Sequence, residues 1–142
     1  MKIVKLRLKK DGQEELLDEL ELVVGLGARG DEKALKKGGD AKLILADEKE
    51  LVRYRDEKKG LCVERFRPHI STEGLDYTIL VPGTVIKIGS AEIEITGLSK
   101  KCFPECEFVK NGLTCGIKFN CATAKVKKSG IVFPDNQIDF IN

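Results

Sequence analysis

Residues 81–97 read VPGTVIKIGSAEIEITG, and this stretch decides the fold class. After the Pro82-Gly83 turn, apolar and polar residues alternate on both sides of Gly89-Ser90. Such alternation is typical of strands buried on one face, and Gly-Ser is a favourable two-residue loop for a type II′ hairpin. The stretch therefore predicts a β-hairpin with four inward-facing isoleucines: Ile86, Ile88, Ile93 and Ile95.

Further short strands are predicted along the chain, at 2–8, 121–126, 131–133 and 137–141. Residues 16–24 predict a short helix that runs into a strand. Residues 47–58 predict the best helix, because Asp47 can cap its start and Glu50 completes a capping box; its charged side is expected to face solvent. Many short strands with one or two short helices indicate a mainly β fold, and a β-barrel or sandwich is the natural architecture.

The composition indicates an ordinary globular protein. The chain has 142 residues, of which 34% are charged and 42% hydrophobic, so we expect one domain over residues 1–142. With 25 basic and 23 acidic side chains, the formal net charge is +2. This net charge gives no strong electrostatic field that would attract nucleic acid or anionic lipid. No apolar run is long enough to span a membrane, and the start lacks a signal peptide, so we expect a cytoplasmic location.

A glycine-rich stretch, 25–39, is predicted to be a surface loop. Gly25, Gly27 and Gly30 have the spacing of a phosphate-binding GxGxxG motif. A dinucleotide site also needs a following helix and a second parallel strand, and the sequence after Gly30 does not indicate them.

The strongest chemical signal is residues 100–125, KKCFPECEFVKNGLTCGIKFNCATAK, which hold four of the five cysteines. In a reducing compartment, clustered cysteines more often bind metal or react than form disulfides. The paired C-x2-C units of common zinc sites are absent, and a CCCH finger would need a histidine where Lys125 stands. A tetrathiolate zinc or iron–sulfur site stays an alternative, with ligands drawn from Cys102, Cys106, Cys115 and Cys121.

The same stretch also suits a reactive thiol. Lys101 precedes Cys102, and nearby positive charge lowers the pKa of a thiol and raises its reactivity. Cys106 stands between two glutamates. Cys115 and Cys121 can equally be small buried residues, and for Cys121, in an alternating strand, we favour that interpretation.

Residues 62–74, CVERFRPHISTEG, carry a second candidate site. An extended backbone would place Arg65, Arg67 and His69 on one side, where they could hold a phosphate or another oxyanion. From this segment alone, two exposed arginines and a histidine with satisfied hydrogen bonds are the simpler interpretation.

Taken together, three pieces of the chain resemble the MOSC domain, the C-terminal module of eukaryotic molybdenum cofactor sulfurases, which also occurs as small free-standing bacterial proteins. Residues 65–69 (RFRPH) are similar to the RFRPN element of larger members. Residues 71–89 are similar to the TTEG(I/L)D…PVG…IG run of the small members, and residues 101–115 to their KxCHxxC…GxC segment. Gly30-Asp31 matches the GD turn of the family without its histidine.

The resemblance implies a β-barrel that handles molybdenum cofactor (molybdopterin) or activated sulfur. Carried over by position, Cys102 and Cys106 become the candidate catalytic thiols, and with Cys115 the candidate metal ligands. The basic residues that the resemblance assigns to the anionic cofactor are Arg65, Arg67, His69 and Lys101.

Two function classes stay open. The first is a molybdenum-cofactor-binding or persulfide-carrying domain, for which the resemblance does not decide whether a sulfurtransferase-like reaction is catalysed. The second is a non-catalytic binding or structural module whose cysteines hold zinc or an iron–sulfur cluster. A protein of molybdenum cofactor synthesis or a sulfur-donor protein is the partner that the resemblance implies.

Overall fold

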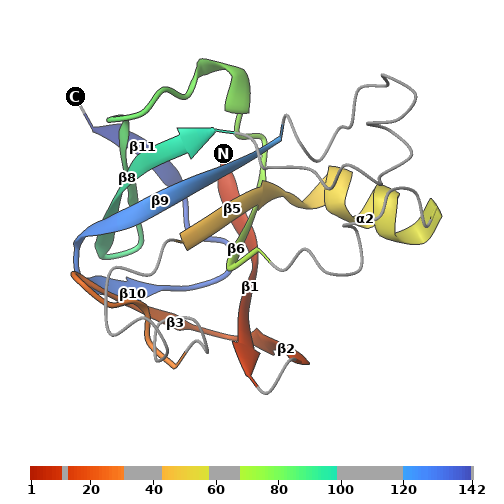
Figure 1. Cartoon of the computed structure of the whole chain (residues 1–142), viewed down its shortest axis with the longest axis horizontal. Helices are drawn as coiled ribbons and strands as arrows, with labels where there is room; N and C mark the ends of the chain where they lie inside the picture. The colour runs from red at the N-terminus through yellow and green to blue at the C-terminus, as the bar shows by residue number, and fades with distance from the viewer. Residues whose placement is uncertain (11–12, 31–42, 58–67, 99–119, 142) are drawn as a thin grey trace.

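The computed structural model describes residues 1–10, 13–30, 43–57, 68–98 and 120–141. Strands dominate this part of the chain, which also has one α-helix and one 3₁₀ helix (Figure 1). The prediction of a mainly β fold with one or two short helices is confirmed. In chain order the elements are β1 (Lys2–Lys10), β2 (Gln13–Leu17), β3 (Leu20–Val23), β4 (Gly27–Ala28), β5 (Leu43–Asp47), α2 (Glu48–Glu57), β6 (Ile70–Glu73), η1 (Tyr77–Ile79), β7 (Val85–Ile88), β8 (Ala91–Leu98), β9 (Cys121–Lys128), β10 (Gly130–Val132) and β11 (Ile138–Ile141).

The main sheet is a curled half-barrel with the strand order β11-β7-β8-β9-β5-β6-β1-β2. Its neighbours are antiparallel except for β5 and β6, which are parallel. The sheet curls until the start of β1 meets the segment before β11: Ile138 N donates to Met1 O at 3.1 Å, and Ile3 N donates to Asn136 O at 2.9 Å. A second, three-stranded sheet has the order β10-β3-β4.

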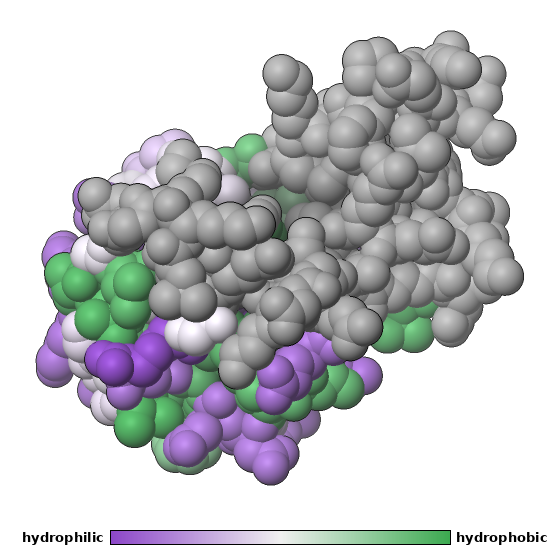
Figure 2. Space-filling model, turned by 60° about the horizontal axis from the view of Figure 1, so that its bottom comes forward, coloured by the Kyte–Doolittle hydropathy of each residue, from purple (hydrophilic) through white to green (hydrophobic). Residues whose placement is uncertain are grey.

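The inner face of the half-barrel is the hydrophobic core. Fully buried side chains come from strands all around it, among them Leu6, Leu45, Ile70, Ile86 and Ile93. Full burial of one such side chain stabilises the fold by roughly 1.5–3 kcal/mol relative to its exposed state. On the face that Figure 2 shows, the described hydrophobic residues lie in small groups among hydrophilic ones.

The hairpin predicted from residues 81–97 is confirmed. Ile86 pairs with Ile93 and Ile88 with Ala91, and the four predicted isoleucines are at most 1% exposed. Gly89 has a φ of +57° while Ser90 has no positive φ, as a type II′ turn requires. The Ser90 hydroxyl accepts a hydrogen bond from Ile131 N at 2.8 Å and so ties the hairpin tip to β10.

Helix α2 begins where the sequence predicts. Glu50 N donates to Asp47 Oδ2 at 3.1 Å, so the predicted cap is present. Leu51 is 1% exposed, but Glu48 is also buried, at 8% exposed, so the expectation that the charged side of the helix faces solvent is wrong at this position. Within the described residues, no helix is long and apolar enough to cross a bilayer.

The prediction of a helix at the start of residues 16–24 is wrong. Residues 16–17 belong to β2 and residues 20–23 to β3, with a two-residue connection between them, and Val24 begins the next turn. Leu17 pairs with Leu6 of β1, and the alternating Leu20 and Leu22 are buried. Cross-strand pairing with β1 overrides the weak local helix preference of this leucine- and glutamate-rich stretch.

Candidate functional site

Most of the residues that the sequence assigns to a site lie outside the described residues, so their prediction stays a prediction. These are Arg65, Arg67, Lys101, Cys102, Cys106 and Cys115. The structure does place His69, and it places the residues through which both predicted segments join the sheet.

The two segments join the sheet on either side of β5. Residues 58–67 connect α2 to β6, and His69 N donates to Ile44 O at 2.9 Å. Residues 99–119 connect β8 to β9, and Asn120 O accepts from Asp47 N at 2.9 Å. Residues 58–67 lead toward β6, and residues 99–119 lead toward β9. Because the sheet order is β9-β5-β6, these two strands flank β5 on opposite sides.

His69 joins three strands through its backbone and its ring. It is 5% exposed, its carbonyl accepts from Arg7 N at 2.8 Å, and its Nδ1 accepts from Ile44 N at 3.0 Å. A neutral imidazole whose Nδ1 accepts a hydrogen bond carries its proton on Nε2. These contacts match the simpler interpretation, a buried histidine with satisfied hydrogen bonds. A role of His69 in binding an anion is still only predicted.

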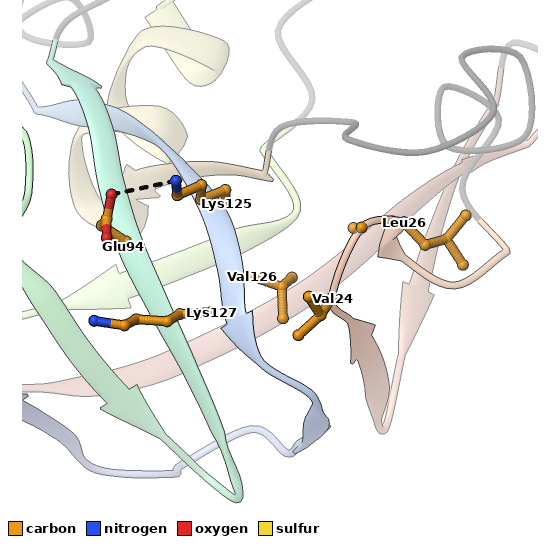
Figure 3. A pocket seen from close by; sticks show the side chains of 8 residues that line it. Val24, Leu26, Glu94, Lys125, Val126 and Lys127 are labelled. Carbon is orange, nitrogen blue, oxygen red and sulfur yellow. Dashed lines mark ion pairs between the residues drawn. The ribbon is translucent and has the colours of Figure 1, made fainter.

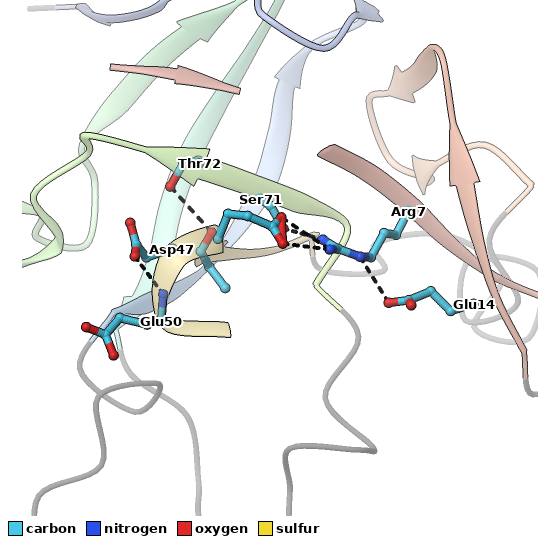
Figure 4. A network of polar contacts seen from close by, with 8 residues as sticks. Arg7, Glu14, Asp47, Glu50, Ser71 and Thr72 are labelled. Atoms are coloured by element: carbon cyan, nitrogen blue, oxygen red, sulfur yellow. Dashed lines mark hydrogen bonds and ion pairs between the residues drawn. The ribbon is translucent and has the colours of Figure 1, made fainter. Parts of the chain in front are cut away.

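A buried ionic network lies between α2 and the sheet (Figure 4). Because Leu6 and Leu8 face the core, the alternation of β1 places Arg7 on the opposite face, where it is only 3% exposed. Its Nη2 donates to both carboxylate oxygens of Glu48, at 3.0 and 3.2 Å. This charge-assisted pair, in which one nitrogen donates to both carboxylate oxygens, holds the start of α2 against β1.

Two further groups complete this network. Arg7 Nη1 donates to the Ser71 hydroxyl of β6. Arg7 Nε lies 3.0 Å from Glu14 Oε1 of β2, at ion-pair distance but without the alignment of a hydrogen bond. One guanidinium thus links β1, β2, β6 and α2. The sequence alone does not reveal this role of Arg7, because a charged residue in an alternating strand is normally expected to face solvent.

A second buried polar group lies where β5, β6 and β9 meet. The Tyr77 hydroxyl is 2.7 Å from Thr72 Oγ1, which is 3.4 Å from Ala46 O. Burial raises the pKa of Tyr77 well above its usual value, and the charges of Asp47 and Cys121 act in the same direction, while the hydrogen bond with Thr72 opposes them. Cys121 is 2% exposed, which fits its interpretation as a small buried residue.

The described residues also form a pocket of about 370 Å³ beside β8 and β9 (Figure 3). Its lining is made by the turn at residues 24–27 and by four side chains of the sheet: Glu94, Lys125, Val126 and Lys127. None of the site residues predicted from the sequence is among them. No group of three histidine, cysteine, aspartate or glutamate side chains within the described residues could hold a metal ion.

Comparisons with known proteins agree with the sequence resemblance. The sequence profile of the MOSC domain matches residues 32–127. No curated protein matches the chain. Among solved structures, a hypothetical protein is 22% identical, with a TM-score of 0.70 over 100% of this chain and 69% of its own. YiiM from Escherichia coli is 18% identical (TM-score 0.62; 100% and 70% covered), and YiiM from Geobacillus stearothermophilus is 13% identical (TM-score 0.63; 99% and 75% covered). At these identities the structures establish the fold alone.

Proposed function

This chain belongs to the MOSC domain family, and from that premise we propose that it binds molybdenum cofactor through a cysteine thiolate and a set of basic side chains. The family is associated with binding related to this cofactor. The observation that carries the proposal is the profile match over residues 32–127, which contains every site residue predicted from the sequence.

The residue types suit the cofactor. Cysteine ligates metals as the thiolate, and Lys101 would favour that form at Cys102. Guanidinium groups bind phosphate through paired hydrogen bonds, which suits Arg65 and Arg67 to the phosphate of molybdopterin. Cys106 and Cys115 are the further thiols of the same segment. When bound, the cofactor supplies the redox chemistry of molybdenum.

The same thiolate would let the chain carry sulfur. The thiolate of Cys102 or Cys106 attacks the outer sulfur of a donor persulfide and forms a new S–S bond, while the S–S bond of the donor breaks. The donor leaves as a thiolate, and the chain holds a cysteine persulfide. The exchange needs no added oxidant or reductant, because one S–S bond forms as another breaks. The persulfide donor would be the predicted partner, a sulfur-donor protein.

Cofactor binding is tested with molybdenum cofactor released anaerobically from a purified molybdoenzyme. After incubation and desalting, molybdenum retained per chain is measured by mass spectrometry. We expect retention by the natural chain and its loss in the Cys102→Ser/Cys106→Ser double variant. We expect at least about tenfold weaker binding in Arg65→Gln/Arg67→Gln, because each charge-assisted hydrogen bond contributes about 1.5–3 kcal/mol.

Matched controls separate site effects from general ones. Cys62→Ser removes the cysteine outside the cluster, and Arg53→Gln removes an exposed arginine of α2 whose side chain is 58% accessible. Both should retain the cofactor. The proposal is wrong if the double cysteine variant binds cofactor and accepts sulfur as well as the natural chain does.

A further inference from the structure

None of the residues proposed to bind the cofactor is among the described residues that line the pocket beside β8 and β9. Half of its lining, the turn at residues 24–27, lies outside the stretch that matches the MOSC profile. Its volume of about 370 Å³ falls within the range of roughly 300–1,000 Å³ typical of small-molecule sites. An inference drawn from this pocket therefore does not rest on the proposed function.

The floor of the pocket is apolar. Val24 and Val126 approach each other across it from the turn and from β9 (Figure 3). Val126 is 7% exposed, but Val24 is 54% exposed, so a bound apolar group would remove valine surface from water. A Cβ added at Gly25 would meet no atom within 4 Å, so the backbone of the turn also borders open space.

The rim of the pocket carries one excess positive charge. Glu94 and Lys125 form an ion pair at 3.5 Å, which leaves the second lysine, Lys127, as the excess charge. Within the described residues Lys127 has no ion-pair partner. Figure 3 shows Lys125 reaching toward Glu94 of β8 and Lys127 extending across β8, away from Val24 and Val126. A lysine ammonium on its flexible stem can follow an anion at the mouth of a pocket.

We propose that this pocket binds a small amphipathic molecule with a single negative charge. Its apolar part lies on Val24 and Val126, and its anionic group, a carboxylate or sulfonate, pairs with Lys127. The lining itself argues for this class of ligand: the floor favours an apolar body, and two ammonium groups against one carboxylate favour a monoanion.

A matched pair of fluorescent probes tests the proposal. 8-Anilinonaphthalene-1-sulfonate carries one negative charge, and N-phenyl-1-naphthylamine has the same rings without the sulfonate. We expect saturable binding of both by the folded chain, with the sulfonate probe bound more tightly. In amide NMR spectra, the probe should shift the signals of Gly25, Gly27 and Val126. Non-saturable binding, or shifts confined to other parts of the chain, would overturn the proposal.

Substitutions separate the two contributions. Lys127→Gln should weaken the sulfonate probe by about two- to fivefold, the scale of one exposed charge pair, and leave the neutral probe unchanged. Val24→Ser should weaken both probes by about fourfold, the equivalent of one buried CH₂. Lys87→Gln, on the neighbouring strand β7 and outside the pocket, is the matched control and should bind both probes normally. If Lys127→Gln and Lys87→Gln bind the sulfonate probe with the same affinity, the role of Lys127 is refuted.

Discussion

Replacing Arg7 with methionine tests the buried network between α2 and the sheet. The variant keeps an apolar stem but removes the guanidinium, so the Glu48 side chain, only 11% exposed, loses both of its contacts at 3.0 and 3.2 Å. Removing one partner of a buried ion pair costs about 3–5 kcal/mol. Because Glu14 is 23% exposed and can turn to water, we expect a cost of about 3 kcal/mol, near the lower limit of that range.

Removing the other partner should cost less. In Glu48→Gln, Arg7 keeps Glu14 at 3.0 Å and its hydrogen bond to Ser71, so we expect a loss of about 1 kcal/mol. The double variant Arg7→Met/Glu48→Gln leaves no unpaired carboxylate at position 48. The double variant should therefore be about 1–2 kcal/mol more stable than the sum of the single costs predicts.

Urea unfolding followed by circular dichroism measures these free energies. Arg53→Met, an exposed arginine of the same helix with a side chain that is 58% accessible, is the control and should change stability by less than about 0.5 kcal/mol. If Arg7→Met costs less than about 1 kcal/mol, or if Glu48→Gln costs as much as Arg7→Met, the reasoning from stranded charge is wrong.

Three further predictions concern stability. Asp47→Ala should lower the free energy of unfolding by about 1 kcal/mol, because it removes the cap on Glu50 N, whereas Asp47→Asn should keep most of it; equal loss in both variants would contradict the capping role. Gly130→Ala should cost about 1–3 kcal/mol in the same urea assay, because its Cβ would lie 2.4 Å from the Ser90 carbonyl carbon; a variant as stable as the natural chain would show that the close approach is absent. Burial raises the pKa of Tyr77, so the unfolded chain releases the tyrosine proton first and stability should fall as pH rises above about 10. Stability curves of the natural chain and Tyr77→Phe check this, since the variant should lack that part of the decline, and identical curves would refute it.

The sequence alone predicts the elements whose defining contacts join residues close to one another in the chain. The alternation of residues 81–97 predicts the hairpin because inward isoleucines and a Gly-Ser turn define one register. Asp47 and Glu50 predict the start of α2 because the cap joins residues only three positions apart. The family resemblance likewise rests on short runs of sequence.

The features that the sequence alone does not predict depend on contacts between residues that are far apart in the chain. Arg7 and Glu48 are 41 positions apart, and only the packing of α2 on the sheet shows that both are buried. The pattern of residues 16–24 predicts a helix at its start because it does not contain β1, the pairing partner that makes β2 a strand. The pocket combines residues 24–27 with β8 and β9, and no local motif joins them. For His69, only the fold shows the hydrogen bond that its Nδ1 accepts from Ile44 N.

Native mass spectrometry of the reduced, tag-free chain tests the proposed function most directly. We expect a metal-free mass that gains the mass of molybdenum cofactor, or of one sulfur atom from a persulfide donor, and loses that gain when Cys102 and Cys106 are replaced. A chain that already holds tightly bound zinc or an iron–sulfur cluster, and that unfolds when the metal is chelated, would contradict the proposal and establish the cysteines as a structural metal site.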